Sequence, residues 1–226
     1  MKTSSPPRYL WLLAFCVLSV AGHAQRHSFK SYGLNEGVPQ SQVLSVVQDR
    51  HGFLWLGTFG GGACRFDGIN FQYYSSKNGL PNNTVWDVLE DSKGNIWFAT
   101  VEGVCRYNGV TFETFNTDHG LADNETYTML EDSKGDIWFG TEGGVSIYSG
   151  NGMVSLKERD GVPEVAVTSL VEAADGTVYI GHFGAGVTIA TESSFARLTE
   201  AEGLSSDLVN CIEEDYQGRM WIRWQW

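Results

Sequence analysis

The sequence predicts an all-β fold, a β-propeller of four-stranded antiparallel blades with about 41 to 42 residues per repeat. The first observation is an aromatic anchor that recurs 42, 41, 41 and 42 residues apart. The anchors are Trp55, Trp97, Trp138, Tyr179 and Trp221. A second landmark, the first glycine of "GVPQSQV", "GLPNNTV" and their later copies, keeps the same spacing. These glycines are Gly37, Gly79, Gly120, Gly161 and Gly203.

Each unit contains short alternating apolar segments, which are typical of strands. In the best-defined unit we expect strands at 84–91, 95–100, 104–108 and 110–116. The dipeptide Asn108-Gly109 predicts a two-residue hairpin turn before the last strand, as Asp67-Gly68 does one unit earlier. Because a single four-stranded sheet cannot bury both of its faces, successive sheets are expected to stack around an axis, with each aromatic anchor packed between neighbouring blades.

The number of blades is expected to be about five, in an incomplete ring. The segment 27–32 precedes Gly37 as 69–74 precedes Gly79, which predicts that the repeats begin with a fourth strand. The last unit stops after two strands, in "MWIRWQW". Since an open stack would expose sheet edges and an apolar face, we expect this sequence to be the amino-terminal part of a longer protein.

Residues 1–24 are predicted to be a signal peptide, and residues 25–226 the propeller repeats. Lys2 and Arg8 form a basic start, the run "YLWLLAFCVLSVAG" is apolar, and "GHA" provides small residues for cleavage. An uncleaved membrane anchor is the alternative. The prediction is therefore an exported, periplasmic protein.

The charge argues against nucleic acid as a partner. The chain has 27 acidic and 15 basic residues, a net charge of −12. Without the predicted leader, which contains Lys2 and Arg8 and no acidic residue, the net charge is −14. A chain this acidic repels phosphate backbones.

The cysteines predict neither a disulfide nor a zinc site. Cys64 and Cys105 occupy the same position in successive units, and such positions lie farther apart than a disulfide allows. We expect both, with Cys211, to be small packed side chains. The acidic "DSKG" turns lack the oxygen-rich spacing of a calcium loop, so Asp91 and Asp132 are expected to close their own turns. No metal and no cofactor are predicted.

The stretch "NGLPNNTVWDVLEDSKGNIWFATVEGVCRYNG" resembles the repeat of the two-component regulator propeller family. The resemblance covers nearly everything after the leader and is poorest in the fourth unit, where Ala173 replaces the turn Asp and Tyr179 the Trp. It implies the periplasmic sensor region of a Bacteroidetes-type hybrid two-component histidine kinase, many of which sense glycan fragments. The expected ligand is thus a small molecule or oligosaccharide. Further repeats, a membrane helix, a kinase and a possible homodimer are implied for the intact protein.

The candidate binding residues lie in the loops that vary while the scaffold repeats. We expect the loops after the second strand of each unit and those before the first strand to gather on one face. The candidates are Phe59, Asn83, Glu102, Asn124, Glu125, Glu142, His182 and Phe183. Aromatic rings with acid and amide groups suit a sugar. For each residue the alternative is an ordinary solvated loop tip.

No catalytic motif is found, and the chain is predicted not to be an enzyme. The histidines His27, His51, His119 and His182 share no repeat position. Two alternatives stay open. A propeller lyase predicts a closed ring and a catalytic histidine beside metal-binding acids. A secreted binding or scaffolding propeller predicts a closed ring with a regular last strand.

Overall fold

The computed structural model describes residues 29–224, so the predicted signal peptide lies outside the described residues. The sheets described below belong to one compact unit that begins at Tyr32. Within residues 29–224, no helix has the length and apolar character needed to cross a membrane.

The described residues form 18 strands and four one-turn 3-10 helices. The first three sheets are β1(Val43–Gln48), β2(Leu54–Thr58), β3(Ala63–Phe66), β4(Phe71–Tyr74); β5(Val85–Glu90), β6(Ile96–Thr100), β7(Gly103–Tyr107), β8(Phe112–Phe115); and β9(Thr126–Glu131), β10(Ile137–Thr141), β11(Gly144–Tyr148), β12(Met153–Ser155). The last two are β13(Val167–Glu172), β14(Val178–His182), β15(Gly186–Ala190), β16(Phe195–Leu198); and β17(Val209–Glu214), β18(Met220–Trp224). The helices are η2(Leu34–Glu36), η3(Thr117–His119), η4(Glu158–Asp160) and η5(Glu200–Glu202).

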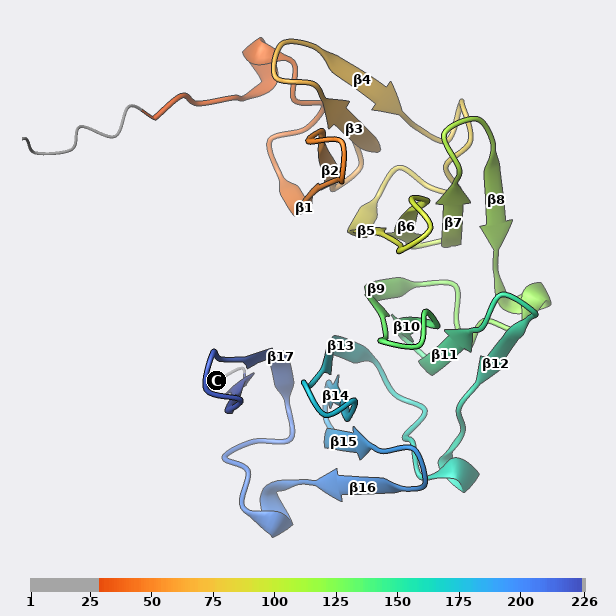
Figure 1. Cartoon of the computed structure of the whole chain (residues 1–226), viewed down its shortest axis with the longest axis vertical. Coiled ribbons are helices and arrows are strands. Elements are labelled where there is room, and N and C mark those ends of the chain that lie inside the picture. The colour runs from red at the N-terminus through yellow and green to blue at the C-terminus, as the bar shows by residue number, and fades with distance from the viewer. Residues whose placement is uncertain (1–28, 225–226) are drawn as a thin grey trace, which may run out of the picture. The chain divides into compact units, whose positions relative to one another are not determined.

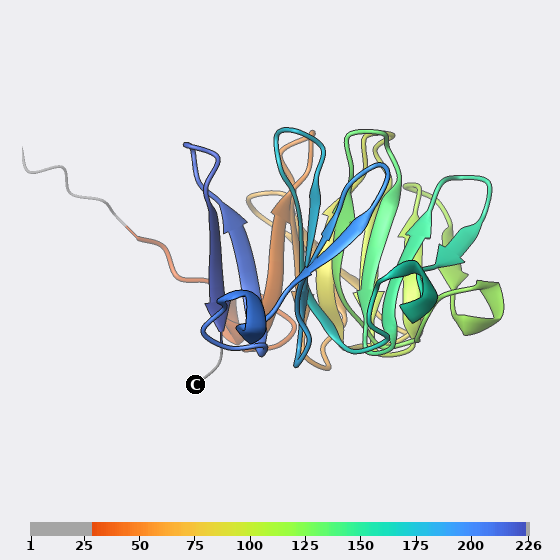
Figure 2. The same ribbon diagram turned by 90° about the horizontal axis from the view of Figure 1, so that it is seen from below.

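The predicted all-β propeller architecture is confirmed. Every sheet is an antiparallel meander, because each strand pairs with the next one in the chain. The first strands of successive sheets, β1, β5, β9, β13 and β17, are neighbours along the inner side of an open arc (Figure 1). Figure 2 shows the sheets side by side, with connecting loops at both ends of the strands. Over the described residues the sheets do not close into a ring.

Two predictions about local structure were wrong. Residues 29–33 form no strand, and residues 27 and 28 of that predicted strand lie outside the described residues. The turn at Asn108-Gly109 is a four-residue connection, in which the Asn108 side chain accepts hydrogen bonds from the backbone of Val110 and Thr111. Gly109 alone takes a positive φ there, of 92°.

Four apolar cores lie between successive sheets. Trp55, 2% exposed, packs with Val88 and Phe98 of the next sheet, and Trp97, 1% exposed, packs with Phe139. Trp138 and Tyr179 occupy the same position in the third and fourth cores. Burial of such aromatic surface is the main favourable contribution to joining one sheet to the next.

Trp221 differs from the other anchors, since it is 61% exposed. It lies on β18, and no sheet follows β18 in the described part of the chain. The expected packing of this anchor between blades is therefore not seen. Cys64 and Cys105 are buried and unpaired, and Cys211 is half-buried and unpaired, in agreement with the sequence.

The turns between first and second strands define one end of the sheets, here called the turn face. Asp91 closes its own turn, as predicted, by accepting hydrogen bonds from the backbone of Lys93 and Asn95. Its second oxygen accepts the indole N–H of Trp97 at 2.9 Å. Asp49 with Trp55, Asp132 with Trp138 and Asp215 with Trp221 repeat this contact.

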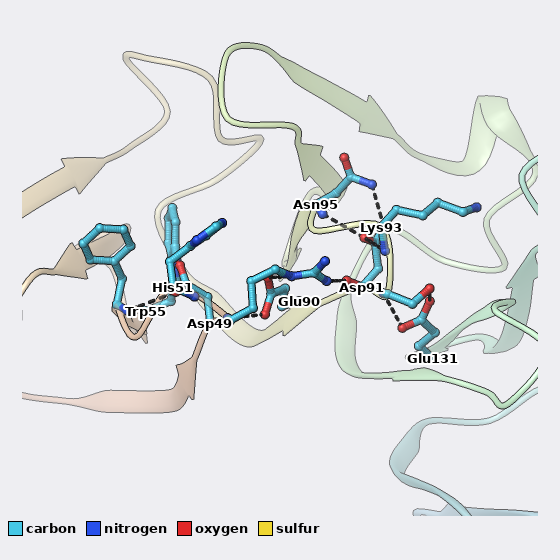
Figure 3. A network of polar contacts seen from close by, with 11 residues as sticks. Asp49, His51, Trp55, Glu90, Asp91, Lys93, Asn95 and Glu131 are labelled. Carbon is cyan, nitrogen blue, oxygen red and sulfur yellow. Dashed lines mark hydrogen bonds and ion pairs between the residues drawn. The ribbon is translucent and has the colours of Figure 1, made fainter.

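A glutamate connects each of the first three sheets to the next at the turn face. Glu90 accepts the backbone N–H and the guanidinium of Arg50 (Figure 3). Glu131 accepts the backbone N–H and hydroxyl of Ser92, and Glu172 those of Ser133. These contacts fix the rotation of one sheet on its neighbour, because both carboxylate oxygens are used.

Candidate functional site

The opposite end of the strands is called the loop face. It is formed by the loops after β2, β6, β10 and β14 and by the loops that lead into β5, β9, β13 and β17. Backbone hydrogen bonds join the two sets, as the repeat predicts: Gly62 N–H to Asn83 O is 2.7 Å, and Glu142 N–H to Glu125 O is 2.8 Å. A ligand on this face would therefore meet loops that hold one another in place.

Phe59 and Phe183 occupy equivalent loops and are each 47% exposed. Phe183 forms a backbone bridge with Leu208. Glu142 and Glu125 come from adjacent loops of the third sheet, and Glu102 follows Thr100, whose hydroxyl accepts its backbone N–H at 3.2 Å. These five residues lie on the loop face as predicted from their loops.

Asn83 and Asn124 play a structural part in their loops. The side-chain oxygen of Asn83 accepts the backbone N–H of Ser76 at 2.8 Å. That of Asn124 accepts the N–H of Thr117 at 2.9 Å. Each amide thus holds its loop closed across seven residues, and its oxygen is already engaged.

His182 does not face a ligand, because it is fully buried. Its Nε2 lies 2.8 Å from the hydroxyl of Thr188 within the same sheet, and its Nδ1 has no hydrogen-bond partner. Burial, with a smaller contribution from the positive charge of Arg197, lowers the pKa of His182 to about 4. The prediction that His182 contacts a ligand is therefore corrected. Its neutral imidazole packs in the core.

A β-bulge brings other side chains to the loop face. In each first strand the pairing with the second strand skips one residue, next to the loop. The skipped residues are Leu44, Trp86, Tyr127, Thr168 and Asn210. A bulged residue has no cross-strand partner, and bulges commonly redirect side chains beside functional sites.

Two of these bulged residues complete an aromatic cluster. The rings of Phe59 and Trp86 are 6.2 Å apart, and those of Trp86 and Tyr127 are 5.5 Å apart, both edge to face. The Tyr127 hydroxyl donates to Glu142 Oε2 at 2.8 Å. Phe59, Trp86, Tyr127 and Glu142 are called the aromatic cluster from here on. It spans the first three sheets and gathers two of the predicted residues.

The indole N–H of Trp86 is the unsatisfied group of this cluster. The nitrogen is buried and has no hydrogen-bond partner among residues 29–224. A buried donor without a partner costs about 1–3 kcal/mol. Trp86 therefore holds its ring between Phe59 and Tyr127 at a cost in stability.

Burial raises the pKa of the Tyr127 hydroxyl, and the hydrogen bond to Glu142 and the charges of Glu125 and Glu142 raise it further. Tyr127 thus stays protonated and donates a hydrogen bond to Glu142.

Asp87, next to Trp86, accepts hydrogen bonds from Met129 N–H at 2.9 Å and from Ser45 Oγ at 3.0 Å. Burial raises the pKa of Asp87, although these hydrogen bonds act to lower it. Asp87 connects three first strands and so fixes the position of Trp86.

Trp86 and Tyr127 are not among the residues predicted from the sequence. The signal was present, because the bulge position varies from Leu44 to Asn210, whereas the residue two places after it is apolar in every unit. A strand pattern of period two hides such a position, since the bulge shifts the alternation by one residue. Among residues 29–224, no group of three or more His, Cys, Asp or Glu side chains is arranged to hold a metal.

Comparison with protein families now identifies the repeat. The model described as two component regulator propeller matches residues 37–60, 79–102, 120–143 and 203–223. Four segments of this chain match the two component regulator propeller repeat. The fourth unit, with Ala173 and Tyr179, is not among the matched segments. Among curated proteins, no relative of this chain was found.

Solved structures with the same fold include extracellular domains from B. thetaiotaomicron. That of BT3049, described as a hybrid two component system, is 25% identical over 70% of this chain and 23% of its own, with a TM-score of 0.64. That of BT4673, with the same description, is 20% identical over 80% of this chain and 26% of its own, with a TM-score of 0.66. This chain thus spans about a quarter of the length of those domains.

Virginiamycin B lyase from Staphylococcus aureus is a more distant neighbour. It is 14% identical over 80% of this chain and 62% of its own, with a TM-score of 0.62. At this identity the likeness concerns the fold alone.

Proposed function

We propose that this chain is a ligand-sensing propeller module in the extracytoplasmic region of a hybrid two-component sensor, and that it is not catalytic by itself. The support is the family of the repeats and the likeness to two extracellular domains of such systems. A signal peptide at residues 1–24 would deliver the module to the periplasm. Further repeats, a membrane helix and a kinase, in an intact sensor that dimerises, would convert binding into phosphorelay.

The aromatic cluster is the proposed ligand site. Its carboxylate acceptor and its exposed ring suit a ligand with both hydroxyl groups and apolar ring faces. An oligosaccharide has this chemistry, because its hydroxyls donate to Glu142 while its C–H faces pack on Phe59. The single observation that carries the proposal is the aromatic cluster on the loop face, where exposed Phe59 and Glu142 flank Trp86 and Tyr127.

A propeller lyase is the alternative in a different class. It requires a histidine placed to transfer protons, whereas the histidine nearest in sequence to the loop face, His182, is buried against Thr188. The cluster instead contains three aromatic side chains and one glutamate. A nucleic-acid partner is disfavoured by the net charge of −12.

Titration calorimetry of the chain against a panel of neutral oligosaccharides tests the proposal. Phe59→Ala should weaken binding of the best saccharide about tenfold, the typical effect of losing one aromatic contact. Phe183→Ala is the matched control, since Phe183 is equally exposed in the equivalent loop of the fourth sheet but outside the cluster. Equal effects of the two substitutions, or binding by none of the saccharides, would contradict this site. Turnover of a saccharide by the chain would contradict the non-catalytic assignment.

A further inference from the structure

A groove of about 270 Å³ opens between the first and second sheets on the turn face, away from the aromatic cluster. It is called the junction groove, and its lining includes His51, Phe53, Arg65, Tyr107 and Asn108. Asp49, Trp55 and Glu90, which also line it, are seen with His51 in Figure 3. Its volume is close to the lower end of the range for small-molecule sites.

Arg65 provides a cationic group in this groove that forms no ion pair with the described residues. Its guanidinium lies 4.4 Å from the ring centre of Phe53 and donates one hydrogen bond, to Gln72 Oε1 at 2.8 Å. No carboxylate pairs with it among residues 29–224. A guanidinium has five N–H donors in a planar fork, so four remain for a ligand.

The next repeat shows how this arginine is otherwise satisfied. Arg106 pairs across the strands with Trp97 as Arg65 does with Trp55, so the two arginines are equivalent. Arg106 forms an ion pair with Glu113 and approaches the Tyr148 hydroxyl at 3.4 Å. Gln72 stands where Glu113 stands in the second sheet. A neutral amide thus takes the position next to Arg65 that a counter-ion occupies next to Arg106.

The corresponding groove between the third and fourth sheets is bridged. Lys134 pairs with Glu192 there at 2.9 Å, and the remaining volume is about 70 Å³. His51 takes the place of Lys134, because each lies two residues after its turn aspartate. The His51 ring is exposed and makes no hydrogen bond to the described residues. The junction groove is therefore open where the later groove is closed.

The acidic groups of the junction groove are already engaged. Asp49 accepts the backbone N–H of His51 and Phe53 and the indole N–H of Trp55. Glu90 accepts both the backbone and the guanidinium of Arg50. The groups left for a ligand are donors on Arg65 and His51, which favours an anion.

We propose that the junction groove binds a small organic acid. Its carboxylate is held by the Arg65 fork, and its ring-shaped body lies against the aromatic lining. Arginine matches a carboxylate in two parallel hydrogen bonds, which a simple point charge does not. This site is independent of the saccharide site on the loop face.

Benzoate is the probe, with benzamide as its neutral counterpart of the same shape, titrated against the chain at physiological salt so that the acidic surface is screened. We expect benzoate to bind at least about tenfold more tightly than benzamide. Arg65→Gln should lose about tenfold or more in benzoate affinity, and Arg65→Lys should lose part of it. Arg106→Gln is the matched control and should leave benzoate binding unchanged, because Glu113 already occupies that arginine.

Gln72→Glu provides a second variant that leaves Arg65 in place. It introduces the residue found in the next repeat, so the chain should fold with the same melting temperature and bind benzoate as weakly as Arg65→Gln. Equal binding of benzoate and benzamide, or equal losses in Arg65→Gln and Arg106→Gln, would overturn the proposal. Sulfate binding as tightly as benzoate would also overturn it, since the groove would then recognise charge without the organic body.

Discussion

The two ends of the sheets differ in how strictly they repeat. At the turn face, Asp91 holds Trp97 and a glutamate joins the next sheet, and the same contacts recur in other units. At the loop face, the bulged residue changes from Leu44 to Trp86 to Tyr127 in successive sheets. Contacts that hold sheets together recur at most junctions, whereas residues that contact a ligand need to occur only once.

The fourth unit shows that the turn-face residues act as a set. Ala173 replaces the turn aspartate and Tyr179 replaces the tryptophan. The carboxylate acceptor and the indole N–H donor of this hydrogen bond are therefore absent together. Ala174 also stands where Ser92 and Ser133 donate to a glutamate of the following sheet. Losing one partner would leave a buried polar group unpaired, whereas losing both costs little.

The largest effect is expected where an anchor lies between two sheets. Trp97→Ala should lower the free energy of unfolding by about 3–5 kcal/mol, because it removes a buried aromatic side chain and leaves a cavity. Trp221→Ala, at the equivalent but exposed position, should lower it by less than about 1 kcal/mol. Urea denaturation followed by circular dichroism measures both. Similar losses in the two variants would show that Trp221 is covered in solution.

A pH-dependent effect is expected at the loop end of β14. Thr58, Thr100 and Thr141 each donate their hydroxyl to a glycine carbonyl in their loops, and His182 replaces this threonine. Its pKa is about 4 in the folded chain, against 6.5 as its ordinary value. The unfolded chain therefore binds a proton first, so stability is complete above pH 6.5 and falls as the pH drops toward 4.

The loss at the low end is up to about 3 kcal/mol. His182→Thr should remove it, because threonine does not titrate and restores the contact of the other units. Urea denaturation at a series of pH values compares the variant with the original chain, and His51→Asn serves as an exposed histidine control. Parallel stability curves for the original chain and His182→Thr would contradict this prediction.

The smallest effect is a gain. Restoring Asp and Trp together in the fourth unit, as Ala173→Asp with Tyr179→Trp, should raise the free energy of unfolding by about 1 kcal/mol through the hydrogen bond seen in the other units. Each single substitution should gain less, because its partner is missing. A double-mutant cycle measures the coupling, and strictly additive effects would show that the pair does not act as a unit.

Local patterns in the sequence were enough for the repeated part of this protein. The spacing of Trp55, Trp97 and Trp138, with strands of period two between them, determined blade length, strand order and the packing of these anchors. The reason is that similar units bury similar faces, so the same apolar pattern occurs in each unit. A departure from the pattern in one unit does not change the assignment of the strands. Asp91 closing its own turn follows from the same local chemistry.

The positions of single side chains at the loop face were decided only by the tertiary structure. The sequence proposed His182 as a ligand-binding residue of the loop face, but the fold buries it beside Thr188. It passed over Trp86 and Tyr127, which a bulge in β5 and in β9 turns toward Phe59 and Glu142. The repeated pattern determines the backbone of each sheet. A bulge, however, shifts the strand register by one residue. Which side chains then come into contact depends on loops from three separate sheets.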